Sequence, residues 1–62
     1  MKKEDIQQYL GKKVLLELSN NFHYTCIINS VTEDTISFID KFNLKHTKNI
    51  SEIIGINEVR ND

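Results

Sequence analysis

Few side chains in this 62-residue chain are suited to catalysis or metal binding. His23 and Cys26 are the only local pair of candidate metal ligands, whereas a zinc site needs about four, so His46 and a carboxylate would have to join them. No paired cysteine or histidine spacing supports such a site. Cysteine catalysis needs a thiolate beside a base and an orienting group, and the two glycines, Gly11 and Gly55, cannot form a glycine-rich phosphate loop. We therefore expect no enzyme, no cofactor and no metal.

The residues best suited to recognition are Lys45, His46, Lys48 and Asn49, which lie close together late in the chain. Lysine and histidine near the end of a strand can contact phosphate, and asparagine can read a base edge with its donor and acceptor groups. The same residues also fit a solvated edge strand, in which lysine only blocks unwanted pairing. The residues alone leave both interpretations open.

The length and the net charge of the chain limit the kinds of protein that it can be. A chain of this size forms a single domain, 1–62, with a small core, and such cores usually depend on disulfides, metals or subunit association. The single cysteine cannot form an internal disulfide, so association is the remaining route. The formal net charge of −1 argues against the broad basic surface of a non-specific nucleic-acid binder, while a local basic site stays open.

The sequence shows no apolar stretch of the roughly 20 residues needed to span a bilayer. The charged start of the chain is followed by no apolar run, so it does not have the pattern of a signal peptide. One unpaired cysteine is also typical of a reducing compartment. A cytoplasmic protein without a membrane partner is the expectation.

The first segment has the spacing of a helix. Ile6, Tyr9 and Leu10 fall at i, i+3 and i+4 and form one apolar stripe. Gly11 follows, and glycine is suited to the left-handed position after a helix. We expect a helix over about 4–10 that ends near Gly11 and lies across an open end of the remaining fold.

From Lys13 onward the apolar residues alternate with a period of two, as in strands buried on one face. Asn20-Asn21 predicts a tight hairpin turn. The alternation slips by one residue before Val31, which indicates a bulge or a sharp bend. The expected strands contain, in order, Val14 to Leu18, Phe22 to Ile28 and beyond, Ile36 and Phe38, Phe42 to Thr47, and, after a 3₁₀ turn at residues 50–53, Ile54 and Ile56.

A short helix followed by five short strands predicts an all-β fold, a small five-stranded Sm-like or SH3-like barrel over about 13–59. The residues expected to form its core are Val14, Leu16, Leu18, Tyr24, Cys26, Ile28, Ile36, Phe38, Ile50 and Ile54. Phe22, Tyr24, Phe38 and Phe42 all have the parity of the core, so packing inside the barrel is favoured over base stacking.

The stretch of residues 18–57 resembles the Sm-like (LSm) family, and its pattern is closest to the bacterial branch of that family, the Hfq RNA chaperones. Residues 18–22 stand where the family has a strand, a turn of Asn-Gly type and a hydrophobic residue. Residues 28–31 resemble its bent second strand. Residues 50–53 resemble the Ile-Ser-x-Val sequence that leads into its last strand.

The resemblance implies a homo-oligomeric ring that binds single-stranded RNA, chiefly A- or U-rich, through loops near residues 32–35 and 47–49. It places Asp34 and Thr35 in the loop where Hfq has a base-stacking aromatic residue. It also matches Lys45 and His46 to the Lys-His pair of Hfq, although here the pair lies farther ahead of the last strand. The implied RNA contacts are Asp34, Thr35, Lys45, His46, Lys48 and Asn49.

The ring is expected to form when the fourth strand of one subunit pairs with the fifth strand of the next. Phe42, Leu44, Ile54 and Ile56 provide more apolar surface than two short strands can hide in one barrel, and a head-to-tail contact stays soluble when it closes into a ring. The alternative is a non-enzymatic protein-interaction or assembly module on an SH3-like barrel, without RNA binding.

Overall fold

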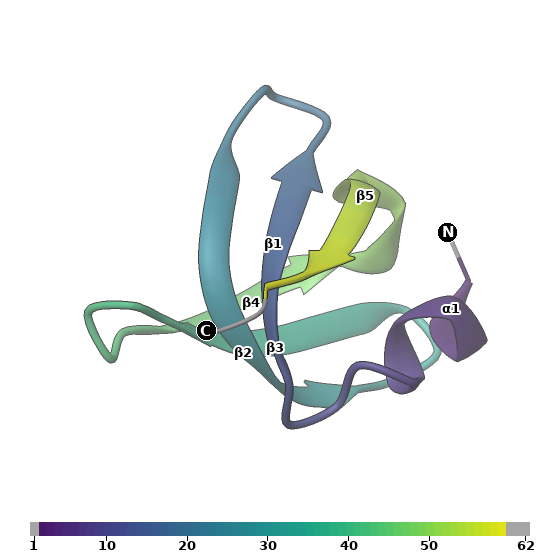
Figure 1. Ribbon diagram of the computed structural model, residues 1–62. Helices are drawn as coiled ribbons and strands as arrows, with labels where there is room; N and C mark the ends of the chain where they lie inside the picture. Colours follow the sequence, from purple (N-terminus) through teal and green to yellow (C-terminus); the bar gives the residue numbers. More distant parts are fainter. Residues whose placement is uncertain (1, 60–62) are drawn as a thin grey trace.

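The computed structural model describes residues 2–59, which form mostly strands, in one antiparallel five-stranded sheet with a short N-terminal helix (Figure 1). The expected all-β class with a leading helix is confirmed. Within residues 2–59, no helix is long and apolar enough to cross a membrane. The elements are α1 (Lys3–Gln7), β1 (Lys13–Leu18), β2 (His23–Val31), β3 (Thr35–Asp40), β4 (Lys45–Asn49), the 3₁₀ turn η1 (Ile50–Glu52) and β5 (Ile53–Glu58).

The sheet is open rather than closed into a barrel. Its strand order is β4-β3-β2-β1-β5, so β4 and β5 are the two edges. In Figure 1 the β3–β4 hairpin runs across the β1–β2 pair, and the bent sheet thereby folds over its own core. The bend lies in β2, whose register with β3 shifts between Ile28 and Ser30. The slip before Val31 therefore predicted the irregularity correctly.

Two of the three hairpin turns use asparagine in the left-handed region. Asn21 has φ 69° in the β1–β2 turn and Asn43 has φ 65° in the β3–β4 turn. The amide of Asn21 donates to the carbonyl of Leu18 at 3.0 Å, and the amide of Phe22 donates to Oδ1 of Asn20 at 3.1 Å. Asparagine tolerates positive φ better than other non-glycine residues, so the predicted Asn20-Asn21 turn is confirmed.

The helix is shorter than expected, because α1 ends at Gln7 rather than near Gly11. The chain then continues as single turns until Leu10 forms a parallel bridge with Ile28 of β2, and the amide of Gly11 donates to the carbonyl of Ile28 at 2.9 Å. These bonds to the sheet replace further helical bonds. Ile6 is fully buried, whereas Leu10 is 41% exposed, so the apolar stripe docks mainly through its first residue.

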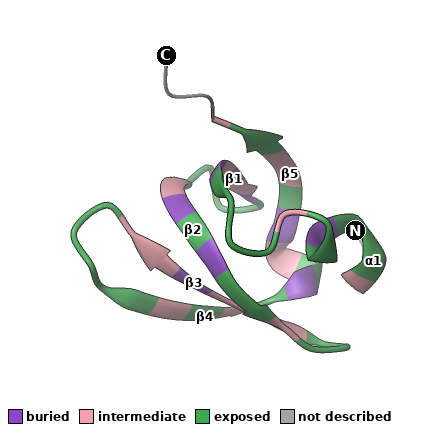
Figure 2. Cartoon of the chain, turned by 60° about the horizontal axis from the view of Figure 1, so that its bottom comes forward, coloured by how far each residue is buried: buried purple, intermediate pink, exposed green. Residues whose placement is uncertain are grey.

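The core contains most of the expected residues. Its buried members are Ile6, Val14, Leu16, Leu18, Cys26, Ile28, Ile36, Phe38, Ile50 and Ile53. Tyr24 is only partly buried against this cluster. Figure 2 shows the resulting alternation of buried and exposed residues along the strands.

The prediction that Ile54 belongs to the core is wrong, because Ile54 is 61% exposed and Ile53 is buried instead. The register between β1 and β5 shifts next to Leu18, which lies opposite Ile53. This irregularity exchanges the inward and outward positions at the start of β5. The last strand therefore begins one residue earlier than predicted and turns Ile53 inward.

The prediction of core packing is also wrong for two of the four aromatic residues. Phe38 is fully buried, but Phe22 is 59% and Phe42 71% exposed. Both exposed rings lie in hairpin turns, since β2 begins at His23 and β4 at Lys45. Leu44, which the sequence placed in the fourth strand, also belongs to the β3–β4 turn and is 60% exposed.

The buried thiol of Cys26 allows a first prediction. Burial, with a smaller contribution from the carboxylate of Asp40, raises the pKa of Cys26 to about 12. Because the thiolate is the reactive form, iodoacetamide at about pH 8 should modify the native protein at least about a hundredfold more slowly than the urea-unfolded chain. Cys26 is the only cysteine, so mass spectrometry of the intact protein follows it directly. Equal rates in the two states would contradict the burial of this side chain.

Candidate nucleic-acid interface

The β3–β4 hairpin is organised by the carboxylate of Asp40, the last residue of β3. Its Oδ1 accepts hydrogen bonds from the amides of Phe42 at 2.8 Å and Leu44 at 3.0 Å, and its Oδ2 lies 2.7 Å from Nε2 of His46. A carboxylate can only accept, so Nε2 of His46 carries the proton. The bond to His46, followed by the bonds to the amides, lowers the pKa of Asp40 below its ordinary value. The carboxylate is therefore held ionised.

The ring of His46 packs against neighbouring side chains rather than facing solvent. Its ring stacks on Phe38 with the centroids 5.2 Å apart and an interplanar angle of 21°, and its centroid lies 5.0 Å from that of Tyr24. Its side chain is 25% exposed. With one ring nitrogen bound to Asp40 and one face against Phe38, His46 fixes the hairpin to the core and has little freedom to contact a ligand.

The structure brings four of the six predicted RNA contacts together, namely Asp34, Thr35, Lys48 and Asn49. Thr35 pairs with Asn49 across β3 and β4, and the carbonyl of Asp34 accepts a hydrogen bond from the amide of Ile50 at 2.8 Å. Lys48 lies opposite Ile36, one position along the same two strands. These residues occupy the end of the hairpin remote from its turn.

The remaining predicted contacts, Lys45 and His46, lie at the other end of β4. Lys45 is exposed and pairs with Ile39, while the next residue, His46, pairs with the buried Phe38. Successive side chains of a strand point to opposite faces of the sheet, so Lys45 lies on the outer face and His46 on the core side. The six predicted residues thus do not form one surface.

The end of the hairpin that carries Asp34 is acidic. A shallow hollow there is lined by Glu33, Asp34, Asn49, Ile50 and Ser51. The carboxylate of Glu33 lies 3.5 Å from Nζ of Lys3, but Asp34 has no cationic partner within the described residues. Like charges close together repel, so these carboxylates oppose the binding of a phosphate group at this loop.

Basic and aliphatic residues gather instead on the outer face of the sheet. Lys13 of β1 pairs with Ile27 of β2, Ile27 pairs with Ile39 of β3, and Ile39 pairs with Lys45 of β4. The four residues therefore form one row across four strands, with a lysine at each end. We call this set the outer-face row.

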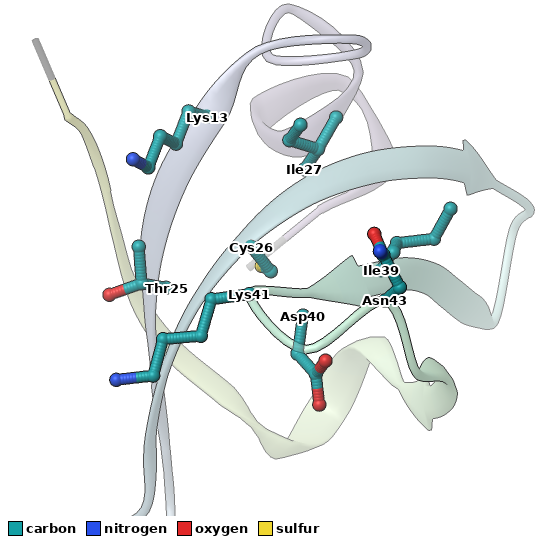
Figure 3. A pocket seen from close by; sticks show the side chains of 8 residues that line it. All are labelled: Lys13, Thr25, Cys26, Ile27, Ile39, Asp40, Lys41 and Asn43. Atoms are coloured by element: carbon teal, nitrogen blue, oxygen red, sulfur yellow. The ribbon is translucent and has the colours of Figure 1, made fainter. Parts of the chain in front are cut away.

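A groove of about 370 Å³ follows three members of the outer-face row (Figure 3). Its lining residues are Lys13, Thr25, Cys26, Ile27, Ile39, Asp40, Lys41 and Asn43. In Figure 3 the side chains of Lys13, Thr25 and Lys41 extend to the same side, whereas the carboxylate of Asp40 points elsewhere. Asp40 is the one acidic residue in the lining, and it is bound to His46. The groove therefore presents mainly positive charge beside an aliphatic floor.

None of the residues that line the groove belongs to the predicted set, and Lys13, Ile27 and Lys41 are examples. Parity along each strand would have placed Lys13 and Ile27 on the outward side. The row itself depends on the register between strands, which the alternation in one strand does not determine. Lys41 joins the groove because the β3–β4 turn, rather than a longer strand, follows Asp40.

The described residues contain no group of three or more His, Cys, Asp or Glu side chains that could hold a metal ion. The absence of enzyme activity stays a prediction. No protein-family model, no curated protein and no solved structure matches the chain, so its resemblance to the Sm-like family is an interpretation of the residue pattern alone.

Proposed function

We propose that the chain is a subunit of a homo-oligomeric, Sm-like ring that assembles through β4 and β5 and binds single-stranded RNA. The observation that carries the assembly is the open sheet with two free edges. An edge strand presents a row of backbone N–H and C=O groups that a second chain can pair with. Pairing β4 of one copy with β5 of the next satisfies both edges at once.

Exposed apolar side chains accompany both edges. Ile54 lies on β5 and is 61% exposed, and Leu44 immediately precedes β4 and is 60% exposed. Burying such side chains between subunits adds to the small core of each copy, and small domains depend on additional burial of this kind. The contact joins different surfaces of the two copies, so it must close into a ring to avoid an open filament.

Substitution at an edge tests the assembly. Ile54→Lys and Leu44→Lys should each reduce the mass seen by sedimentation at micromolar concentration to the 7.3 kDa of a single chain, because each would place a charge in the subunit contact. Phe22→Lys is the matched control, since Phe22 is equally exposed but lies in the β1–β2 turn. A parent protein of 7.3 kDa would overturn the ring, and edge variants that stay assembled would overturn the choice of strands.

The outer-face row supports the RNA-binding part of the proposal. Lys13 and Lys41 line the groove, and Lys45 lies beside it because it pairs with Ile39. Each phosphate contact to a single strand contributes a slope of about −0.7 in log affinity against log salt. Three contacts predict a loss of affinity of roughly twentyfold between about 50 and 200 mM salt.

Fluorescence anisotropy with oligo-A and oligo-U at these salt concentrations measures this slope. An affinity that falls as calculated supports phosphate contact by the lysines.

The second candidate function is an assembly module without RNA binding, and it is favoured by the carboxylates of Glu33 and Asp34 at the loop where the resemblance places the RNA. Under that alternative neither oligonucleotide binds, although the oligomer still forms.

A further inference from the structure

The turn of the β3–β4 hairpin presents an aromatic ring to solvent. Phe42 is 71% exposed, more than any other large hydrophobic residue of the described chain. A single exposed apolar side chain is common, but this one lies beside a basic groove. The residues around Phe42 indicate whether its ring can bind a ligand.

The backbone under Phe42 is held in one conformation. The carboxylate of Asp40 accepts hydrogen bonds from the amides of Phe42 and Leu44. The amide of Asn43 donates to the carbonyl of Asp40 at 3.0 Å, and the amide of Asp40 donates to the carbonyl of Leu44 at 2.9 Å. A group already fixed in space loses little conformational entropy when it binds, so the ring is displayed on a preorganised turn.

One lysine lies beside the ring. Nζ of Lys41 lies 5.3 Å from the centroid of Phe42, within the range of a cation–π contact. A second hollow, lined by Leu15, His23, Tyr24, Thr25, Asp40, Lys41 and Phe42, adjoins the groove of Figure 3 and shares Thr25, Asp40 and Lys41 with it. The aromatic ring therefore stands at the end of a basic groove that continues toward Lys13.

We propose that Phe42 stacks an unpaired nucleobase at the hairpin turn, while Lys41 and Lys13 contact the phosphates that follow it along the groove. An aromatic platform beside a basic groove is the arrangement that recognises single-stranded nucleic acid. A duplex keeps its bases stacked on each other and cannot offer a free base. This inference rests on the proposed RNA binding and names its site, but it does not depend on ring formation.

The chain contains no tryptophan, so Phe42→Trp introduces a single indole whose emission reports on the turn. Titration with a dodecamer of adenosine nucleotides should quench its emission as a base stacks on the indole, and the affinity should stay within about twofold of the parent. Phe42→Ala should lose about tenfold in affinity by anisotropy. The matching RNA duplex should compete at least about tenfold more weakly than the single strand.

Leu10→Trp is the control for quenching, because Leu10 is also exposed but bridges to Ile28 and lines neither the groove nor the second hollow. The stacking role would be overturned if the emission of Phe42→Trp did not change on saturation with RNA, or if Phe42→Ala kept the affinity of the parent. Either result would leave RNA binding intact. A parent that binds no oligonucleotide would overturn RNA binding as well. A change of oligomeric mass in Phe42→Ala would show instead that the side chain of Phe42 contacts a second protein chain.

Discussion

Replacing Phe38 with alanine should remove most of the stability of the fold. Phe38 is fully buried, and its ring packs against Tyr24 at 5.3 Å and His46 at 5.2 Å between centroids. Truncating a buried phenylalanine costs about 3–5 kcal/mol, because it removes apolar burial and leaves a cavity. Domains are stable by roughly 0.05–0.15 kcal/mol per residue, so a chain of this length has little left after such a loss.

Urea unfolding followed by circular dichroism measures the effect. Phe42→Ala is the matched control, since it removes the same side chain from a position that is 71% exposed, and it should change the free energy of unfolding by less than about 0.5 kcal/mol. Similar losses in the two variants would contradict the assignment of one ring to the core and the other to solvent.

The second large effect is expected at Asp40, whose carboxylate joins the hairpin turn to His46. Hydrogen bonds hold the pKa of Asp40 below its ordinary value of 3.8. A carboxyl with a lowered pKa in the folded state stabilises the fold when it is ionised, so this contribution is complete above the ordinary value and is lost as pH falls through the lowered one. The urea midpoint of the parent should therefore decrease below about pH 4.

Asp40→Asn tests this linkage, because the amide keeps the size of the side chain but does not ionise. Its urea midpoint should be lower than that of the parent at neutral pH and should depend less on acid. Asp34→Asn is the control, since the described structure shows no hydrogen bond to the Asp34 carboxylate. An unchanged acid profile in Asp40→Asn would show that other carboxyl groups determine the acid sensitivity.

The strands, the bulge in β2 and the 3₁₀ turn could be predicted because each leaves a local trace in the order of apolar residues. The inward side of β1 follows directly from Val14, Leu16 and Leu18. The alternation of apolar residues gave a wrong prediction where hydrogen bonds from a side chain lengthen a turn. Phe42 has the same parity as a core residue, but the bonds from the turn to Asp40 draw it out of the strand.

The site was harder to predict than the fold. Lys45 was recognised as a candidate from its neighbours in sequence, yet its neighbour across the sheet is Ile39. The outer-face row is defined by pairing between strands, and single-strand periodicity contains no information on register. The negative charge of the β2–β3 loop could be read from Glu33 and Asp34 in the sequence. That this charge lies close to Asn49 could be known only from the pairing of β3 with β4.

The placement of β5 beside β1 also determines the order in which the chain can fold. Three hairpins join strands that are neighbours in sequence, but Leu16 pairs with Ile56 from the opposite end of the chain. Closing so long a loop costs more entropy than closing a hairpin, and such distant pairings slow the folding reaction. The β1–β4 meander can therefore form first, with one side of β1 bare until β5 arrives. During synthesis this interval leaves β1 open to pairing with another nascent chain.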